Sequence, residues 1–299
     1  MPSSGGGWRA HGPHPLMGQP EPVPLPRTSE GRAGIEAVLA DPARALVALD
    51  YDGTLAPIVD QPSEAVPASG ALHALGRLAP RVRLVVVITG RPAPVVVQLA
   101  GLQGAEGLEH LLVLGQYGLQ RWDAAGGLTQ PEPLPGVTGA RRDVSRLLAE
   151  DGSGLRLEDK EHSLVVHARA TSGGDAALER LAPAIRGTAE QAGLEVHPGR
   201  SVLELRPPGH DKGGALLAVI DEYQADAVLV AGDDLGDLPA FAAVEKRRAA
   251  GHPGCTVASD SAELDAVRER ADLVVDGPVG VVSLLNWLAD ELDARGAMG

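Results

Sequence analysis

Short apolar runs recur along most of the chain and alternate with amphipathic stretches. Six of these runs are rich in Val, Leu and Ile, at 45–49, 83–88, 111–114, 227–231, 255–258 and 272–275. Continuous apolar runs of this kind are typical of parallel strands buried on both faces. Helical patterns lie between most of them. The pattern therefore predicts an α/β fold, a Rossmann-like doubly wound parallel sheet whose sites lie at the carboxyl ends of the strands.

The middle of the chain has a different pattern. Helices are expected at 141–150 and 175–192, and short strands at 155–157, 163–167, 195–197 and 202–206. The first two strands predict a hairpin whose turn includes Asp159 and Lys160. We therefore expect an α+β domain at 138–208, inserted into a core made of residues 34–137 and 209–299.

The start of the chain, 1–33, is rich in Gly and Pro, and we expect it to be disordered. It lacks the apolar region of a signal peptide. No apolar run approaches the roughly 20 residues that span a bilayer, so we expect no membrane partner.

The composition narrows the function classes. The net charge of −14 argues against a nucleic-acid partner, which would require a basic face. Cys255 is the only cysteine, so no intramolecular disulfide can form. A reducing, cytoplasmic location fits this composition, and we expect a monomer.

Two aspartates follow the first apolar run directly, in Asp50-Tyr51-Asp52-Gly53-Thr54. Because side chains alternate along an extended backbone, Asp50 and Asp52 could point the same way at the end of a strand. Two carboxylates held that close repel unless a cation or a shared proton lies between them. With a hard divalent ion in place, one carboxylate can attack and the other can move protons. The alternative is a plain turn, because Asp-Gly is a common turn dipeptide.

Two candidate anion-binding residues lie further along the chain. Thr89 ends the second apolar run and precedes Gly90 and Arg91, so a hydroxyl and backbone N–H groups could hold phosphate oxygens there. Thr89 could equally cap a helix. Lys212 begins a helix, where a lysine opposes the helix dipole, so it is not placed for helix stability. It could offset phosphate and carboxylate charge, or it could be an ordinary solvated lysine.

A second acidic group follows a later buried strand, with Asp233, Asp234 and Asp237 in one short loop. Loop carboxylates at a strand end suit Mg²⁺, which favours one or two carboxylates together with water and substrate oxygens. The alternative is an acidic loop in which Asp237 caps a helix.

Together the motifs Asp-x-Asp-Gly-Thr, Thr-Gly-Arg, Lys-Gly and Gly-Asp-Asp-x-x-Asp resemble those of the haloacid dehalogenase-type phosphatases, over about 45–122 and 209–290. The resemblance implies that Asp50 forms an aspartyl-phosphate and that Asp52 is the general acid and then the base. It implies that Thr89 and Lys212 bind phosphate. It also implies Mg²⁺ as cofactor, at a site that includes Asp50, Asp52, Asp233, Asp234 and Asp237.

Two segments of the inserted domain narrow the family. Glu158 to Arg169 and His197 to Gly209 are similar to cap segments of trehalose-6-phosphate phosphatases. The resemblance implies that the substrate-binding residues include Arg91, Gln116, Glu158, Lys160, Arg169, Arg200 and Glu204. Carboxylates accept hydrogen bonds from sugar hydroxyls, and Lys or Arg donates to hydroxyls or phosphate.

Some positions depart from the family or allow another interpretation. The family usually has Gly-Asn-His-Gly where this chain has Gly115-Gln116-Tyr117-Gly118; Gln116 can replace the Asn, but Tyr117 changes any role of the His. The last acidic loop lacks the family's Glu. We expect Glu161 and His162 to be solvated. Glu204 alternates with Leu203 and Leu205, so it could also face solvent.

From the resemblance we expect hydrolysis of trehalose 6-phosphate to trehalose and phosphate by a Mg²⁺-dependent phosphomonoesterase, the last step of trehalose biosynthesis. Two rivals remain. One is a phosphatase of the same superfamily for another sugar phosphate, such as sucrose 6-phosphate or a mannosyl phosphoglycerate. The other is a catalytically inactive sensor of sugar phosphates.

Overall fold

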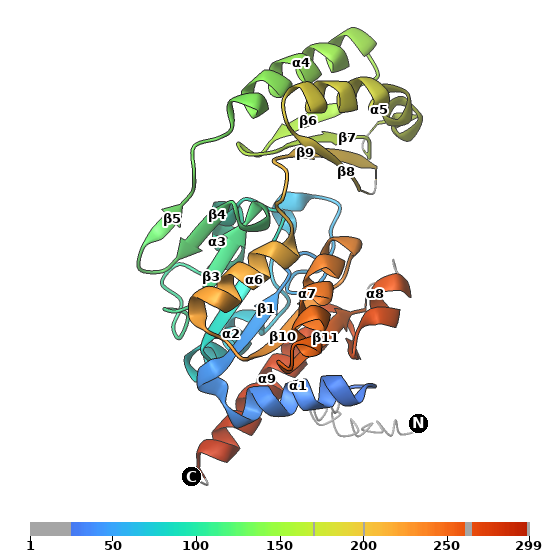
Figure 1. Ribbon diagram of the computed structural model, residues 1–299. Helices are drawn as coiled ribbons and strands as arrows, with labels where there is room; N and C mark the ends of the chain where they lie inside the picture. Colours follow the sequence, from blue (N-terminus) through green and yellow to red (C-terminus); the bar gives the residue numbers. More distant parts are fainter. Residues whose placement is uncertain (1–24, 170, 200, 261–264, 298–299) are drawn as a thin grey trace, which may run out of the picture.

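The computed structural model describes residues 25–169, 171–199, 201–260 and 265–297. An eight-stranded sheet forms the centre of the larger domain, in the order β12-β11-β10-β1-β2-β3-β4-β5 (Figure 1). The six strands from β12 to β3 run parallel. They are β1 (Ala45–Leu49), β2 (Leu84–Ile88), β3 (Leu112–Gly115), β10 (Ala227–Gly232), β11 (Gly254–Ser259) and β12 (Leu273–Val275). These are the six apolar runs, so the α/β prediction is confirmed.

Helices cover both faces of this sheet because the strands are apolar on both. Along β1, Val47 and Leu49 belong to the cluster beneath one helical layer, while Leu46 and Ala48 belong to the other. The first layer contains α1 (Ser29–Ala40), α2 (Ala71–Leu78), α3 (Ala93–Ala100) and α9 (Gly277–Gly296). The second contains α6 (Lys212–Tyr223), α7 (Leu238–Ala249) and α8 (Asp265–Arg270).

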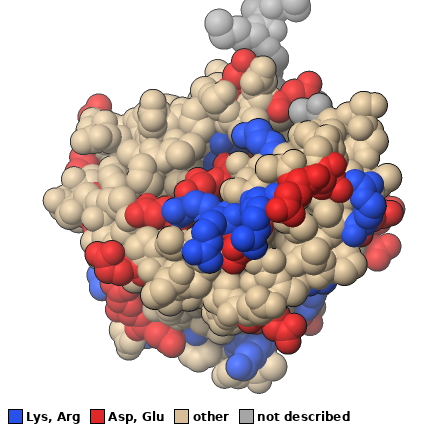
Figure 2. Space-filling view, turned by 90° about the horizontal axis from the view of Figure 1, so that it is seen from above, with Lys and Arg blue, Asp and Glu red and all other residues tan. Residues whose placement is uncertain are grey.

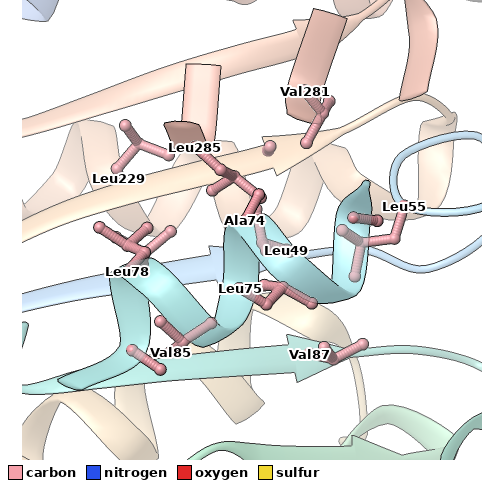
Figure 3. Close-up of a cluster of buried hydrophobic side chains, with 14 of the residues drawn as sticks. Leu49, Leu55, Ala74, Leu75, Leu78, Val85, Val87, Leu229, Val281 and Leu285 are labelled. Carbon is pink, nitrogen blue, oxygen red and sulfur yellow. The ribbon is translucent and has the colours of Figure 1, made fainter. Parts of the chain in front are cut away.

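The first layer is packed mainly with Ala, Val and Leu. Figure 3 shows Leu75 and Leu78 of α2 beside sheet residues such as Leu49 and Val85. Fully burying one such side chain contributes about 1.5–3 kcal/mol. This packing holds the carboxyl ends of the strands in a fixed arrangement.

Two antiparallel strands extend the sheet beyond β3, namely β4 (Gln120–Asp123) and β5 (Gly127–Thr129). The sequence did not predict them. Their residues are mostly polar, and only Gln120 and Trp122 are buried. A half-exposed edge hairpin lacks the continuous apolar run that marks the parallel strands.

The inserted domain, called the cap from here on, is a four-stranded antiparallel sheet in the order β6-β7-β9-β8 with two helices. Its elements are α4 (Pro135–Asp151), β6 (Arg156–Asp159), β7 (Leu164–His167), α5 (Gly174–Gln191), β8 (Glu195–Gly199) and β9 (Val202–Arg206). The predicted boundary at residue 138 falls inside α4. Both helices lie on the face of the sheet that points away from the core (Figure 1).

Alternation along the cap strands separates an apolar face from a polar one. Leu164, Leu203 and Leu205 are buried in the cluster with the cap helices. Glu204 lies between two of these leucines, so its side chain points to the opposite face. The polar face of the cap sheet is therefore the face presented to the core.

Part of the segment predicted to be disordered is helical. Residues 1–24 lie outside the described residues, but α1 begins at Ser29, inside the predicted 1–33 tail. The Thr28 hydroxyl accepts a hydrogen bond from the Gly31 N–H at 3.0 Å and so caps the helix. Val38 and Leu39 are buried against the sheet, which local composition did not reveal.

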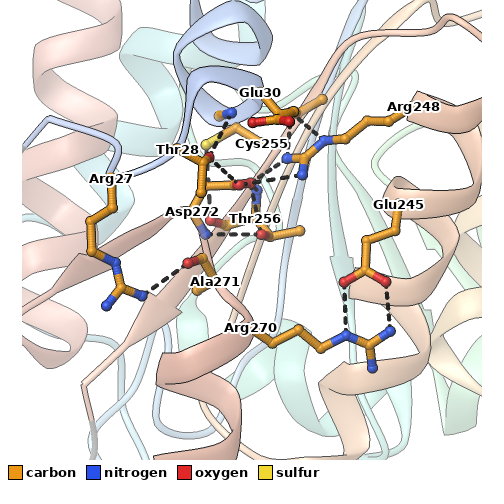
Figure 4. Close-up of polar contacts among 12 residues, drawn as sticks. Arg27, Thr28, Glu30, Glu245, Arg248, Cys255, Thr256, Arg270, Ala271 and Asp272 are labelled. Atoms are coloured by element: carbon orange, nitrogen blue, oxygen red, sulfur yellow. Dashed lines mark hydrogen bonds and ion pairs between the residues drawn. The ribbon is translucent and has the colours of Figure 1, made fainter.

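A buried aspartate directly before the edge strand β12 fixes the start of α1 to that edge of the sheet (Figure 4). Asp272 accepts hydrogen bonds from the Thr28 hydroxyl at 2.5 Å and from the Thr256 N–H at 2.8 Å, and it pairs with Arg248. These donors lower the pKa of Asp272, although burial alone would raise it. Asp272 is therefore ionised and fully partnered, which is the condition for a buried charge to be tolerated.

Charges of both signs mix on the cap side of the molecule. Figure 2 shows basic and acidic side chains interspersed there, seen from above. In the cap, Arg141 pairs with Asp159 at 2.8 Å and Arg180 pairs with Asp151 at 2.8 Å. That the protein has no nucleic-acid partner stays a prediction. Among the described helices, none is both long enough and apolar enough to span a bilayer.

Candidate active site

The parallel register brings the motif residues to one edge of the sheet. Leu49 is aligned with Val87 of β2 and with Ala231 of β10. Asp50, which follows Leu49, donates its N–H to the Ala231 carbonyl at 2.9 Å. The turn after β2 and the acidic loop after β10 therefore flank Asp50, as expected for the carboxyl end of a doubly wound sheet.

Lys212 joins two carboxylates at this edge. Its Nζ donates to Asp50 Oδ1 at 2.6 Å and to Asp237 Oδ1 at 2.7 Å. All three side chains are buried. Burial alone would lower the pKa of Lys212, but the negative charges of Asp237 and Asp50 outweigh it and raise that pKa. The lysine is thus a permanent cation, and the solvated alternative is excluded.

The carboxylates outnumber the cations that face them. Oxygen atoms of Asp50, Asp233 and Asp237 lie within 4.8 Å of one another. Burial, with the neighbouring carboxylates, raises the pKa of Asp233 to about 8, and burial raises the pKa of Asp50 well above its usual range. Such groups resist ionisation until another cation arrives.

The cluster fits Mg²⁺ by the chemistry of its ligand atoms. All its ligand atoms are carboxylate oxygens, which Mg²⁺ prefers. Gly53 has a φ of 76°, and a Cβ there would lie 2.0 Å from Asp233 Oδ2. Only glycine lets the loop after Asp50 come this close to Asp233. Asp50 and Asp233 are the residues that would hold the ion.

Two acidic residues of the loop also shape the backbone. Asp237 Oδ2 accepts the N–H groups of Asp233 and Asp234, at 3.1 and 3.2 Å. Asp234 Oδ1 accepts the Gly236 N–H at 2.8 Å and caps η5 (Leu235–Asp237). Asp237 thus accepts three hydrogen bonds, including one from Lys212, and Asp234 lies outside the three-carboxylate cluster. Their roles as metal ligands stay predictions.

Asp52 does not join the buried cluster. Its carboxylate receives two hydrogen bonds from Arg91, at 2.6 and 2.7 Å. Its side chain is 39% exposed, so solvent reaches it. Thr89 is buried, and its hydroxyl accepts the Arg91 N–H at 3.1 Å, which fixes the turn from Thr89 to Arg91. Asp52, Thr89 and Arg91 therefore line one side of the site.

The cap residues Lys160 and Glu204 lie where the cap meets this turn of the core, a contact region called the seam from here on. Lys160 Nζ is 3.3 Å from the Gly90 carbonyl of the core and 3.3 Å from Glu204 Oε1 of the cap. Gln116 of η4 (Gln116–Gly118) is buried and donates its side-chain amide to the Lys160 carbonyl at 2.6 Å. The alternative that Glu204 faces solvent is wrong, because its exposed fraction is 8%.

The other predicted cap residues are spread more widely. Glu158 pairs with His167 at 2.6 Å, and this hydrogen bond lowers the pKa of Glu158. Arg169 is exposed and lines a cavity of about 630 Å³ between the cap and the core segment 58–60. None of the strand-end aspartates lines this cavity. Arg200 lies outside the described residues.

The sequence prediction is wrong for His162 and does not include the contacts that Ser163 and Tyr117 make at the seam. His162 was expected to be solvated, but its exposed fraction is 2% because the turn of the cap hairpin is pressed against the core. The Ser163 hydroxyl lies 3.3 Å from both Gln116 Oε1 and Glu204 Oε1. The Tyr117 hydroxyl donates to Glu204 Oε2 at 2.9 Å. Periodicity could not find these contacts, since all of them except the Ser163–Glu204 contact cross between the domains.

Comparison with known proteins decides the family. The family profile described as trehalose-phosphatase matches residues 48–277. The chain belongs to the trehalose-phosphatase family. The match begins just before Asp50 and ends just after the last strand, so it includes the whole cap and every motif described above.

Relatives of the family include trehalose-phosphate phosphatases of mycobacteria. That of Mycobacterium marinum is 33% identical over 266 residues, which cover 85% of this chain and 63% of the relative. That of Mycobacterium avium is 32% identical and covers 83% of this chain and 62% of the relative. This chain thus spans less than two thirds of the length of these relatives.

Solved structures of trehalose-6-phosphate phosphatases and of a haloacid dehalogenase-like hydrolase share the fold. The C-terminal domain of C. albicans trehalose-6-phosphate phosphatase superposes with a TM-score of 0.69 at 20% identity, covering 90% of this chain and 99% of that one. The Aspergillus fumigatus trehalose-6-phosphate phosphatase gives 0.61 at 24% identity, covering 89% and 99%. A haloacid dehalogenase-like hydrolase from Bacteroides thetaiotaomicron gives 0.58 at 18%, covering 82% and 99%. The haloacid dehalogenase-type fold is confirmed.

Proposed function

We propose that this chain hydrolyses trehalose 6-phosphate to trehalose and phosphate. The observation that carries the proposal is the seam, where Lys160 of the cap contacts both the Gly90 carbonyl in the turn after β2 and the Glu204 carboxylate of the cap. A sugar held by these two side chains would present its phosphate to the turn and to Asp50. Family membership supports the same substrate.

The first step is attack by a buried carboxylate on phosphorus. An oxygen of Asp50 forms a bond to phosphorus, and the bond from phosphorus to the sugar 6-oxygen breaks, leaving an aspartyl-phosphate. Lys212, which lies 2.6 Å from Asp50, stabilises the charge on the transferring oxygens. A bound Mg²⁺ would keep Asp50 ionised and screen its repulsion from phosphate.

Asp52 moves the protons in both steps. It gives its proton to the departing sugar oxygen, because a sugar alkoxide is a poor leaving group. In the second step it takes a proton from the water that attacks phosphorus, which restores Asp50 and releases phosphate. Arg91 holds the Asp52 carboxylate with two hydrogen bonds, so the pair must loosen when Asp52 carries its proton.

The cavity beside Arg169 is large enough for a sugar, although neither Lys160 nor Glu204 lines it. Its volume of about 630 Å³ lies within the usual range for small-molecule sites. Arg169 of the cap and Asp60 of the core offer a donor and an acceptor for hydroxyl groups across it. Mg²⁺ dependence, a cytoplasmic location and the monomeric state belong to the same proposal.

Replacing Lys160 by alanine separates sugar recognition from chemistry. We expect Lys160→Ala to raise KM for trehalose 6-phosphate roughly tenfold or more, because a charged hydrogen bond contributes about 1.5–3 kcal/mol. The KM for a small generic phosphate ester should change far less. Steady-state kinetics of both substrates measures this difference.

Lys246→Ala is the matched control, because Lys246 is an exposed lysine of α7 away from the seam. Its kinetic constants should equal those of the unaltered protein. Equal effects of Lys160→Ala on both substrates would rule out sugar recognition by this residue.

A further inference from the structure

Tyr117 crosses from the core to the cap. It lies in η4, directly after β3, where its φ of 58° is unusual for a residue with a side chain. Gln116 before it also has a positive φ, of 48°. Such conformations cost about 1–3 kcal/mol each and persist only where surrounding contacts hold them.

Contacts on the core side fix the Tyr117 ring over the turn from Thr89 to Arg91, which is the proposed phosphate-binding turn. The Tyr117 N–H donates to the Thr89 carbonyl at 3.0 Å. A Cβ on Gly90 would lie 2.6 Å from the Tyr117 hydroxyl oxygen, so the ring covers this glycine directly. Tyr117 therefore rests on the segment from Thr89 to Arg91.

Contacts on the cap side tie the same ring to the sugar-binding face. The hydroxyl donates to Glu204 Oε2 at 2.9 Å, and the Arg206 guanidinium carbon lies 4.1 Å from the ring centroid. Glu204 Oε1 faces Lys160 and Ser163, each at 3.3 Å. One carboxylate oxygen is thus held by the core, and the other lies among longer contacts that a sugar hydroxyl could replace.

We propose that Tyr117 is a positioning residue that orients Glu204 toward the sugar and couples the cap to the phosphate-binding turn. This inference rests on the proposed function. Burial, together with the Glu204 charge, raises the pKa of Tyr117. The hydroxyl therefore remains a donor at every pH at which the protein would work.

A thermodynamic cycle tests the coupling between Tyr117 and Glu204. All proteins carry Asp50→Asn so that the ligand binds without turnover, and Mg²⁺ is present. Calorimetry measures the Kd of trehalose 6-phosphate and of inorganic phosphate for the parent, Tyr117→Phe, Glu204→Ala and the double variant. Tyr117→Phe removes the hydroxyl but keeps the ring that Arg206 covers.

We expect Tyr117→Phe to weaken binding of trehalose 6-phosphate about tenfold and to change the Kd of phosphate less than about twofold. In the Glu204→Ala background the same substitution should have little further effect. Tyr223→Phe is the matched control. It removes a hydroxyl that is 3.0 Å from Arg121 on the core, and it should leave both Kd values unchanged.

The possible results distinguish a failure of this inference from a failure of the proposed function. Equal weakening of both ligands, or additive effects of Tyr117→Phe and Glu204→Ala, would overturn the positioning role alone. A parent that binds trehalose 6-phosphate no more tightly than phosphate would overturn the proposed function and this inference together. Thermal melting shows whether each variant is folded before it is titrated.

Discussion

Replacing Asp50 by asparagine should lower kcat for trehalose 6-phosphate at least about 1,000-fold, because the nucleophile is lost. The fold should survive. Asparagine has the same shape and keeps a side-chain oxygen that can accept the hydrogen bond from Lys212. Lys212 keeps its contact with Asp237 at 2.7 Å. Phosphate release and thermal melting measure the two effects.

The control for this substitution is Asp226→Asn. Asp226 precedes β10 at the opposite, amino end of the strand and pairs with Arg44 on the surface. Surface pairs contribute little to stability, and this one is far from the chemistry, so its activity should be unchanged. If Asp50→Asn kept more than about a tenth of the turnover, the assignment of the nucleophile would be wrong.

Removing divalent cations with a chelator should abolish turnover and make the protein less stable as the pH rises. The folded-state pKa of Asp233 is about 8, well above the value of 3.8 for a free aspartate. The folded state therefore holds a proton that the unfolded chain has released. The stability linked to this proton is complete below about pH 4 and is lost as the pH rises toward about 8.

Added Mg²⁺ should reverse this loss, because it binds the ionised carboxylates of the folded state. At a concentration about 100 times Kd, binding adds about 2.7 kcal/mol, which raises Tm by roughly 5 °C or more. The rise should be larger at about pH 8 than at about pH 5.5, where protons compete with the ion. Melting curves at both values measure it.

Asp233→Asn provides the comparison for the metal experiment. Without a carboxylate at this position, the metal-free protein should be less sensitive to pH, and Mg²⁺ should raise Tm much less. A rise in Tm that was equal at both pH values, or equal in Asp233→Asn, would place the ion elsewhere in the chain.

The sheet and the core of the site could be predicted because their signals are local. Each parallel strand is a continuous apolar run, and each motif follows such a run. Once the strands lie in one sheet, their carboxyl ends must meet, which brings Asp50 and Asp233 together. The sequence also predicts that Lys212 begins a helix, and Lys212 is the first residue of α6.

The contacts between the domains could not be predicted, because no local pattern encodes them. Glu204 alternates with buried leucines, so alternation alone places it on a polar face without telling whether that face meets water or the core. The burial of His162 and the contact of Tyr117 with Glu204 depend on how the cap rests on the core. The start of α1 could not be predicted for a similar reason. Thr28, which caps this helix, is held by Asp272, and Asp272 is distant in sequence.

The most direct test of the proposed function measures phosphate release in the presence of Mg²⁺ from trehalose 6-phosphate, sucrose 6-phosphate and glucose 6-phosphate. We expect kcat/KM to be highest for trehalose 6-phosphate, by at least about tenfold, and a chelator or Asp50→Asn to remove the activity. Equal rates on the three sugar phosphates, or no release from trehalose 6-phosphate, would contradict it.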